Sequence, residues 1–126
     1  MNDTRLTEAL TAAARRAAEE AATAPPARAQ ATRYLVSCLP EEQADRYLFA
    51  LQVEYRGSDR WAVTRHGECL NRDGNWDWEH RPSEREDEWL AEHRFDLDTA
   101  LDLAKAAAPL ITVNGFTVAD ALTGPA

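Results

Sequence analysis

The sequence has no apolar run near the roughly 18 residues that a membrane-spanning helix requires. Its N-terminus carries charge throughout and lacks the apolar segment of a secretory signal. The only cysteines are Cys38 and Cys69, which is too few for a disulfide framework. Two such thiols in a chain without a secretory signal are typical of a reducing compartment. These absences predict a cytoplasmic protein that does not contact a membrane.

Motifs of familiar chemistry are missing as well. The five glycines are scattered and form no phosphate-binding loop, and no G-x-S-x-G nucleophile motif occurs. Zinc sites usually show two close ligand pairs, whereas this chain offers one loose pair, His66 and Cys69. Residues three apart on a strand face opposite sides unless a bulge at Gly67 corrects the register. We therefore expect no metal, no cofactor and buried, unreactive cysteines.

An excess of positive charge is also absent. Acidic residues number 22 against 14 lysines and arginines, and the net charge is −8. The whole excess lies between Asp73 and Asp102, which holds eleven acidic residues and three arginines, while the remainder holds eleven of each. This window would repel a phosphate backbone, so direct nucleic-acid binding is not expected. It is typical of a solvated helical surface or of a surface for basic partners.

The length of 126 residues fits one domain with an appendage. Residues 1–30 predict an alanine-rich helical arm that Pro25 and Pro26 end. Leu6 and Leu10 begin a thin apolar stripe along this helix, which could pack on the body, pair with a second copy or fray. A homodimer through the N-terminal helix is one partner prediction. Residues 31–126 are predicted to form the folded core.

The first half of the core predicts strands. Residues 33–40 alternate as a strand does, although a helix also fits, and 47–56 show the clearest period of two. Residues 60–66, 68–71 and 75–79 follow, with a hairpin turn at Asp73-Gly74. The predicted result is an antiparallel meander of four or five strands. Its buried side should carry the following residues: Tyr47, Phe49, Leu51, Val53, Tyr55, Trp61 and Val63.

The second half predicts helices. Ser83 and Glu86 form an S-x-x-E capping box for a helix over 83–93. Asp96 or Asp98 caps a second helix that Pro109 ends. A short strand, an Asn-Gly turn and a short helix capped by Thr117 complete the chain. The second helix should bury a stripe of four residues, namely Leu97, Leu101, Ala104 and Ala108. Strands followed by helices predict an α+β fold, in which the meander is covered by two C-terminal helices.

The stretch "NRDGNWDWEH" (71–80) combines aromatic rings, acids and an imidazole. Asp77 and Glu79 lie on one face of the predicted strand, roughly 7 Å apart, which suits a carboxylate-dependent hydrolase assisted by His80. Trp76 and Trp78 point the opposite way, however, so the rings and acids do not line one pocket. The simpler interpretation is amphipathic alternation, with the tryptophans toward the core and the acids toward water.

Taken together, these patterns favour a small acidic, non-enzymatic protein-binding or regulatory module. Its partner would be a protein with a basic surface. Two alternatives stay open, the hydrolase and an anti-defence protein that mimics nucleic acid. The predicted partner-binding residues are all acidic: Asp77, Glu79, Glu84, Asp87, Glu88 and Glu92.

Six stretches of the core carry a resemblance to other proteins: "VEYRG", "RWAV", "CLNRDGNWDWE", "RPSEREDEWLAEHRF", the spaced pattern "AL.LA...AP" (100–109) and "TVNG". In these the chain resembles a group of small proteins from high-GC actinobacteria and their phages. The resemblance covers about the C-terminal three-quarters and excludes residues 1–30. It implies a source and a compartment, and it favours an accessory or host-interaction role. It transfers no functional residue, because the group has no established activity.

Overall fold

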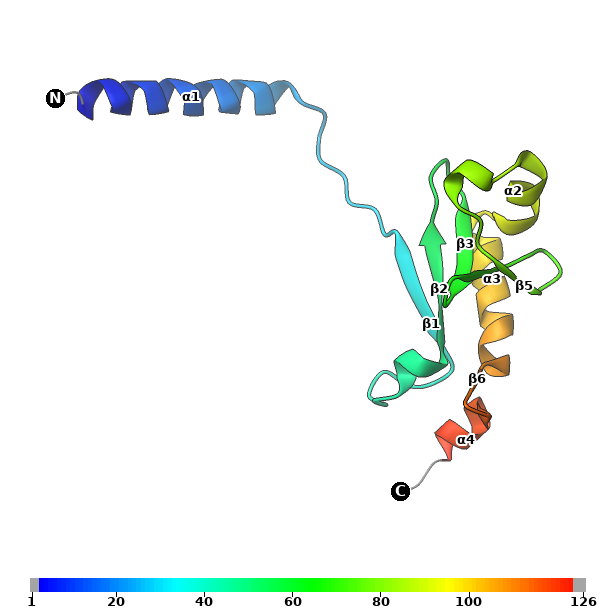
Figure 1. Ribbon diagram of the computed structural model, residues 1–126. Coiled ribbons are helices and arrows are strands. Elements are labelled where there is room, and N and C mark those ends of the chain that lie inside the picture. The colour runs from blue at the N-terminus through cyan, green and yellow to red at the C-terminus, as the bar shows by residue number, and fades with distance from the viewer. Residues whose placement is uncertain (1–2, 124–126) are drawn as a thin grey trace. The chain divides into compact units, whose positions relative to one another are not determined.

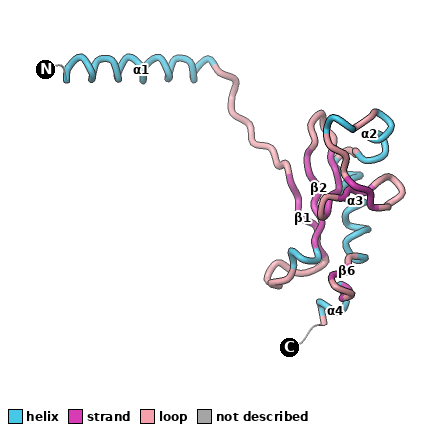
Figure 2. The backbone as a smooth tube through the Cα atoms, in the orientation of Figure 1, coloured by secondary structure: helices cyan, strands magenta, loops and turns pink. Residues whose placement is uncertain are grey.

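The computed structural model of this protein describes residues 3–123. The chain divides into two compact units, Met1–Gln30 and Ala31–Ala126. The first contains helix α1, Asp3–Thr23, followed by an extended segment through the two prolines (Figure 2). Alanine favours this helix, but Leu6 and Leu10 stay 62% and 63% exposed. Helix α1 therefore carries an apolar stripe that nothing within its own unit covers.

The second unit is built on one antiparallel sheet with the strand order β1-β2-β3-β4-β5 (Figure 1). This confirms the predicted α+β fold of a meander followed by helices. The bounds of the strands are β1 Arg33–Ser37, β2 Ala50–Tyr55, β3 Trp61–Arg65, β4 Glu68–Leu70 and β5 Trp76–Trp78. Residues 33–40, for which a helix was also compatible, thus begin with a strand. Each strand pairs with the next in sequence, so every connection is a local hairpin or loop.

One face of the sheet forms the hydrophobic core. Val53 and Val63 are register partners with no exposed surface, and they pack in one cluster with Ala100 and Ala104 of helix α3, Leu97–Ala107. Small alanines let α3 approach the strands closely. The opposite face is more polar, and there Thr64 donates to Glu54 across β2 and β3 at 2.6 Å. The two faces therefore differ as period-two alternation requires.

The predicted strand over 47–56 is wrong at its beginning, over residues 47–49. Residues Arg46–Phe49 form the short 3-10 helix η1, and β2 begins only at Ala50. Tyr47 is consequently 74% exposed, although the alternation placed it in the core, while Phe49, Leu51 and Val53 are buried as expected. Ser37 explains the change, because its hydroxyl donates to the carbonyl of Phe49 at 2.8 Å and holds the η1 turn against β1.

A two-residue turn separates β3 from β4. His66 and Gly67 have φ values of 52° and 81°, the left-handed pair that a tight hairpin of this twist requires. Of the bulge or bend that the sequence predicts at Gly67, the structure shows a bend, in the form of this hairpin turn. The next hairpin turns at Asp73-Gly74 as predicted, and Asn71 stabilises it by accepting hydrogen bonds from the backbone of Asp73 and Asn75.

The predicted helix over 83–93 is shorter than expected. Residues Pro82–Glu84 form the 3-10 helix η2, and helix α2 covers only Asp87–His93. Neither element has a side-chain cap, so the predicted capping box of Ser83 and Glu86 is wrong. The Arg85 side chain explains the break, since it donates to the carbonyl of His80 and ties residues 80–85 into a compact turn.

Helix α3 and the C-terminal elements follow the predictions more closely. Asp96 caps α3 through the backbone of Thr99, as one of the two predicted options. Its buried stripe is shifted, however, because Ala100, Ala104 and Ala108 are buried while Leu97 and Leu101 are half-buried at the margin. The C-terminal elements are η3 Ala108–Leu110, β6 Thr112–Val113, β7 Phe116–Thr117 and α4 Val118–Leu122, which Thr117 caps as predicted.

Over residues 3–123, no helix combines the length and the apolar character needed to cross a membrane.

Candidate functional site

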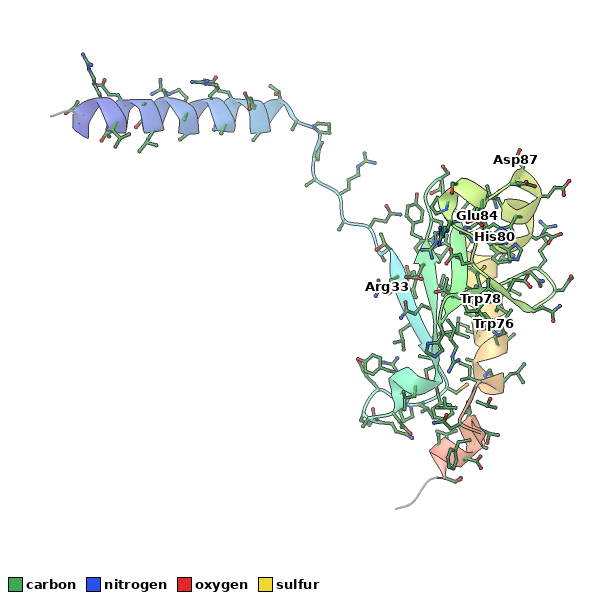
Figure 3. All side chains as sticks on the ribbon, in the orientation of Figure 1. Arg33, Trp76, Trp78, His80, Glu84 and Asp87 are labelled. Carbon is green, nitrogen blue, oxygen red and sulfur yellow. The ribbon has the colours of Figure 1, made fainter. Side chains whose placement is uncertain are left out.

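Strand β5 and the residue after it, Glu79, place two tryptophans and two carboxylates on opposite sides of the sheet. The side that is buried differs from the side that the sequence predicts. Trp78 is 71% exposed, whereas the Glu79 side chain is only 15% exposed. Trp76 is half-buried against the core (Figure 3). The reason is tertiary: residues of helix α2 and the segment after it bond to both carboxylates and cover their side of β5. The prediction of tryptophans inward and acids outward is therefore wrong for Trp78 and Glu79.

Glu79 is the centre of a cluster of three arginines. Its carboxylate accepts two hydrogen bonds from Arg56, both at 2.9 Å, which form a bidentate pair. Arg94 donates to Glu79 at 2.9 Å and Arg85 donates at 3.4 Å. The three guanidiniums come from the end of β2, the η2–α2 connection and the end of α2. One carboxylate thus links three segments and leaves an excess of positive charge around itself.

The pKa values of the cluster fit this charge distribution. Burial by itself raises the pKa of Glu79, but the hydrogen bonds from Arg56 and the charges of all three arginines outweigh burial and leave that pKa below its usual value. The pKa of Arg56 is raised, chiefly by its hydrogen bond to Glu79. Burial lowers the pKa of Arg94, and the charge of Glu79 opposes this effect. At neutral pH Glu79 is therefore a carboxylate that holds three cations in place.

A second ionic pair lies beside this cluster. His93 is buried, and its Nε2 lies 2.7 Å from Oδ2 of Asp77 while its Nδ1 lies 2.7 Å from the carbonyl of Trp89. The imidazole is thus held between a backbone carbonyl oxygen and a carboxylate oxygen. The pKa of Asp77 is lowered, first by the hydrogen bond from His93. This pair fastens α2 to β5.

Helix α2 also carries a stack of rings. The indole of Trp89 stacks with His80 and with His93, with ring centroids 4.8 Å and 4.3 Å away and planes within 15°. The guanidinium of Arg94 lies 4.9 Å from the centroid of Trp89. Trp89 is therefore in contact with two imidazoles and a guanidinium of the same chain.

The arginines open onto a cleft of about 480 Å³. We call it the arginine cleft, and five of its lining residues are arginines: Arg56, Arg60, Arg72, Arg85 and Arg94. Gly57 and Ser58 of the β2–β3 loop, Leu90 and Ala91 of α2, and one acid, Asp87, complete the lining. Three segments that are separate in sequence thus concentrate positive charge in a chain of net charge −8.

Comparison of the chain with protein-family models, with curated proteins and with solved structures finds no match. The resemblance to actinobacterial and phage proteins accordingly stays a prediction.

The structure divides the six predicted acidic site residues into two groups. Asp77 and Glu79 are bound by His93 and the arginines. The other four, Glu84, Asp87, Glu88 and Glu92, are exposed around η2 and α2, and Figure 3 shows Glu84 and Asp87 there. Only Asp87 lines the arginine cleft. The six therefore do not form one surface.

The residues weighed as metal ligands do not come together. Over the described part of the chain, no group of three or more histidine, cysteine and acidic side chains could hold a metal ion. Both cysteines are free, Cys69 is buried as expected, and Cys38 is exposed, contrary to the prediction. Burial, followed by the charge of Glu79, raises the pKa of the Cys69 thiol to about 11, so it is not a thiolate at neutral pH.

The arginines of the cleft were not found from the sequence. Arg56, Arg60 and Arg72 lie in parts of the chain whose charges balance, and Arg85 and Arg94 lie in the acidic window. Summing charge along the sequence hides a cluster that folding assembles from both parts. The nearest signal is that Arg85 and Arg94 are two of only three arginines within the acidic window.

Proposed function

We propose that this chain is a small non-enzymatic binding module whose arginine cleft holds an anionic group of a protein partner. One observation carries the proposal: five arginines from separate segments line one cleft of a strongly acidic protein. Arginine suits this role because its planar guanidinium binds oxyanions through two parallel hydrogen bonds.

The arginines fall into two sets that suit binding. Arg56, Arg85 and Arg94 are held by Glu79, and their side chains are 25%, 20% and 5% exposed. In the described structure, Arg60 and Arg72 are exposed and their side chains have no hydrogen bond or ion pair. The first set is already ordered, so a ligand meets it at little entropic cost. The second set has all its donors available.

The hydrolase alternative draws less support from the geometry. A pair of catalytic carboxyls needs one member that keeps a proton near neutral pH. The pKa values of Asp77 and Glu79 are both lowered, the first by a hydrogen bond from His93 and the second by hydrogen bonds from Arg56. A nucleic-acid mimic needs free carboxylates spaced over a surface, and two of the six predicted acidic residues, Asp77 and Glu79, are already bound. Binding therefore remains the function that we propose.

The proposal is tested by calorimetric titration of the full chain with a triglutamate peptide and with a trilysine peptide at low salt. We expect triglutamate to bind and salt to weaken it, because exposed charges are screened. Replacing both Arg60 and Arg72 by glutamine should weaken binding roughly tenfold or more, as hydrogen bonds to charged groups are lost. Arg81→Gln is the matched control, since Arg81 is 86% exposed and lies outside the cleft.

The same titration tests the acidic surface as a second candidate. Glu84, Asp87, Glu88 and Glu92 are exposed, so they are free to meet the basic partner that the sequence predicts. Binding of trilysine without triglutamate would contradict the arginine cleft and favour that acidic surface. Binding of neither peptide would leave both surfaces without support.

A second copy of the chain is the partner that we propose for α1. Leu6 and Leu10 are exposed on a helix of 21 residues, and such a stripe is commonly buried between paired helices. Leu10→Lys should convert a dimer into a monomer, whereas Ala12→Lys, off the stripe, should not. Light scattering of both variants and the unchanged chain measures this, and equal masses for all three would contradict the pairing. The two free thiols fit the cytoplasmic location that we infer.

A further inference from the structure

We propose that the anionic group held by the arginine cleft is a phosphate monoester on a peptide side chain. This inference rests on the proposed function and names its ligand. Clusters of arginines recognise phosphorylated side chains in several unrelated domains, because such clusters match both the charge and the oxygens of the group. Three features of this cleft favour that ligand over a carboxylate or a nucleotide.

The first feature is the amount of charge. Five guanidiniums line the cleft. The carboxylates that form ion pairs with them or share the lining are three: Glu54, Glu79 and Asp87. The excess over these three is two positive charges, and the more distant Asp96 offsets part of it through its interaction with Arg60. A phosphate monoester carries about −1.5 to −2 at pH 7, whereas a glutamate side chain carries one negative charge. The remaining positive charge therefore attracts the monoester more strongly than the carboxylate.

The second feature is the direction of the donors. Arg60 follows the β2–β3 turn, Arg72 lies in the β4–β5 turn, and Arg85 and Arg94 lie before and after α2. A ligand in the cleft thus meets guanidiniums from three separate segments. A phosphate has three terminal oxygens arranged around phosphorus, whereas a carboxylate has two oxygens in one plane. The Glu79 carboxylate already accepts from three guanidiniums of the cleft, and a phosphate in the cleft has one more oxygen to accept from guanidiniums of all three segments.

The third feature is the absence of an aromatic platform in the described lining. No aromatic residue lines the cleft, and the nearby Trp89 already stacks with His80 and His93. Nucleotide and single-strand sites gain much of their affinity from bases stacked on such rings. The non-basic lining here is Leu90, Ala91 and the Gly57-Ser58 loop, with Asp87 as an acceptor for a backbone N–H. This lining suits a peptide.

The test is an NMR titration of the full chain with four probes at pH 7. They are a short glycine peptide with one central phosphoserine, the same peptide with glutamate there, adenosine monophosphate and inorganic phosphate. The phosphopeptide should bind about tenfold more tightly than the glutamate peptide, the difference that one added charge-assisted pair provides. Its affinity should rise between pH 5 and pH 7, because the second phosphate proton is lost near pH 6.

Substitutions of single arginines test whether the phosphopeptide binds in the arginine cleft. Arg72→Gln and Arg60→Gln should each weaken the phosphopeptide severalfold and reduce the pH effect, whereas Arg81→Gln, outside the cleft, should change neither. Equal binding of the phosphopeptide and the glutamate peptide would overturn the phosphate assignment and leave the anion-binding module standing. Equal or tighter binding of adenosine monophosphate or inorganic phosphate would overturn the peptide part. No binding by any probe would overturn this inference and the proposed function together.

Discussion

Replacing Glu79 by glutamine should lower the free energy of unfolding by about 3 kcal/mol, the lower end of the range for breaking a buried ion pair. Glutamine keeps the size of the side chain but removes the charge that holds three guanidiniums. Arg94, 5% exposed, then keeps its hydrogen bond to the carbonyl of His93 but loses the carboxylate that balances its charge, in a site where water cannot fully replace it. The lower end applies because Arg56 and Arg85 keep 25% and 20% exposure. Urea unfolding at pH 7 measures the change.

Glu84→Gln is the control for this substitution. The Glu84 side chain is 59% exposed, and its only described ion pair, with Arg81, spans 3.9 Å. Surface pairs of this kind contribute little, so the control should stay within about 0.5 kcal/mol of the unchanged chain. Equal losses from both substitutions would show that Glu79 does not organise the arginines in solution.

The pH dependence of stability gives a second measurement on the same variant. The pKa of Glu79 is lowered in the folded chain, while the unfolded chain titrates near the usual value of about 4.3. The stability contributed by Glu79 is therefore fully present above that pH and is lost as the pH falls through the folded pKa. The unfolding free energy of the unchanged chain should fall more steeply between about pH 5 and pH 3 than that of Glu79→Gln. Parallel profiles would contradict the lowered pKa.

Replacing Trp61 by alanine should cost about 3 to 5 kcal/mol, the range for removing a large aromatic side chain from a core. Trp61 is 5% exposed, and its ring packs against Tyr34 and Tyr55 with centroids 5.7 Å and 5.1 Å away. Its backbone also exchanges two hydrogen bonds with Phe95, at 2.8 Å and 3.0 Å. The substitution would leave a cavity between the sheet and the segment that leads into α3. Chemical denaturation followed by circular dichroism measures the loss.

Trp78→Ala is the matched comparison. The sequence pattern places Trp78 in the core, but the structure leaves it 71% exposed over the β3–β4 turn, where a Cβ added to Gly67 would lie 3.3 Å from the ring. Its removal should cost less than about 1 kcal/mol, because little apolar surface leaves the interior. If Trp78→Ala proved as destabilising as Trp61→Ala, the core placement predicted from alternation would be correct and the structural placement wrong.

The comparison of Trp61 with Trp78 also shows how far alternation can be trusted. Trp61 lies on a strand paired on both sides, so its buried face follows from the period of two. Trp78 is the last residue of the edge strand β5 and is exposed. Alternation correctly separated it from Asp77 and Glu79, but it could not tell which of the two sides would be covered. That choice depends on where α2 packs.

The sequence by itself determined the local features of this protein. The α+β order, the meander, its turn at Asp73-Gly74 and the cap of α4 at Thr117 all follow from residues close together in the chain, and the cap of α3 was narrowed to Asp96 or Asp98. The tertiary structure alone decided the chemistry of the site. It brought Arg56, Arg60 and Arg72 to Arg85 and Arg94, and it buried Glu79 among three of them. The physical reason is that backbone periodicity and capping act over a few residues, whereas charge acts through space between segments that only folding brings together.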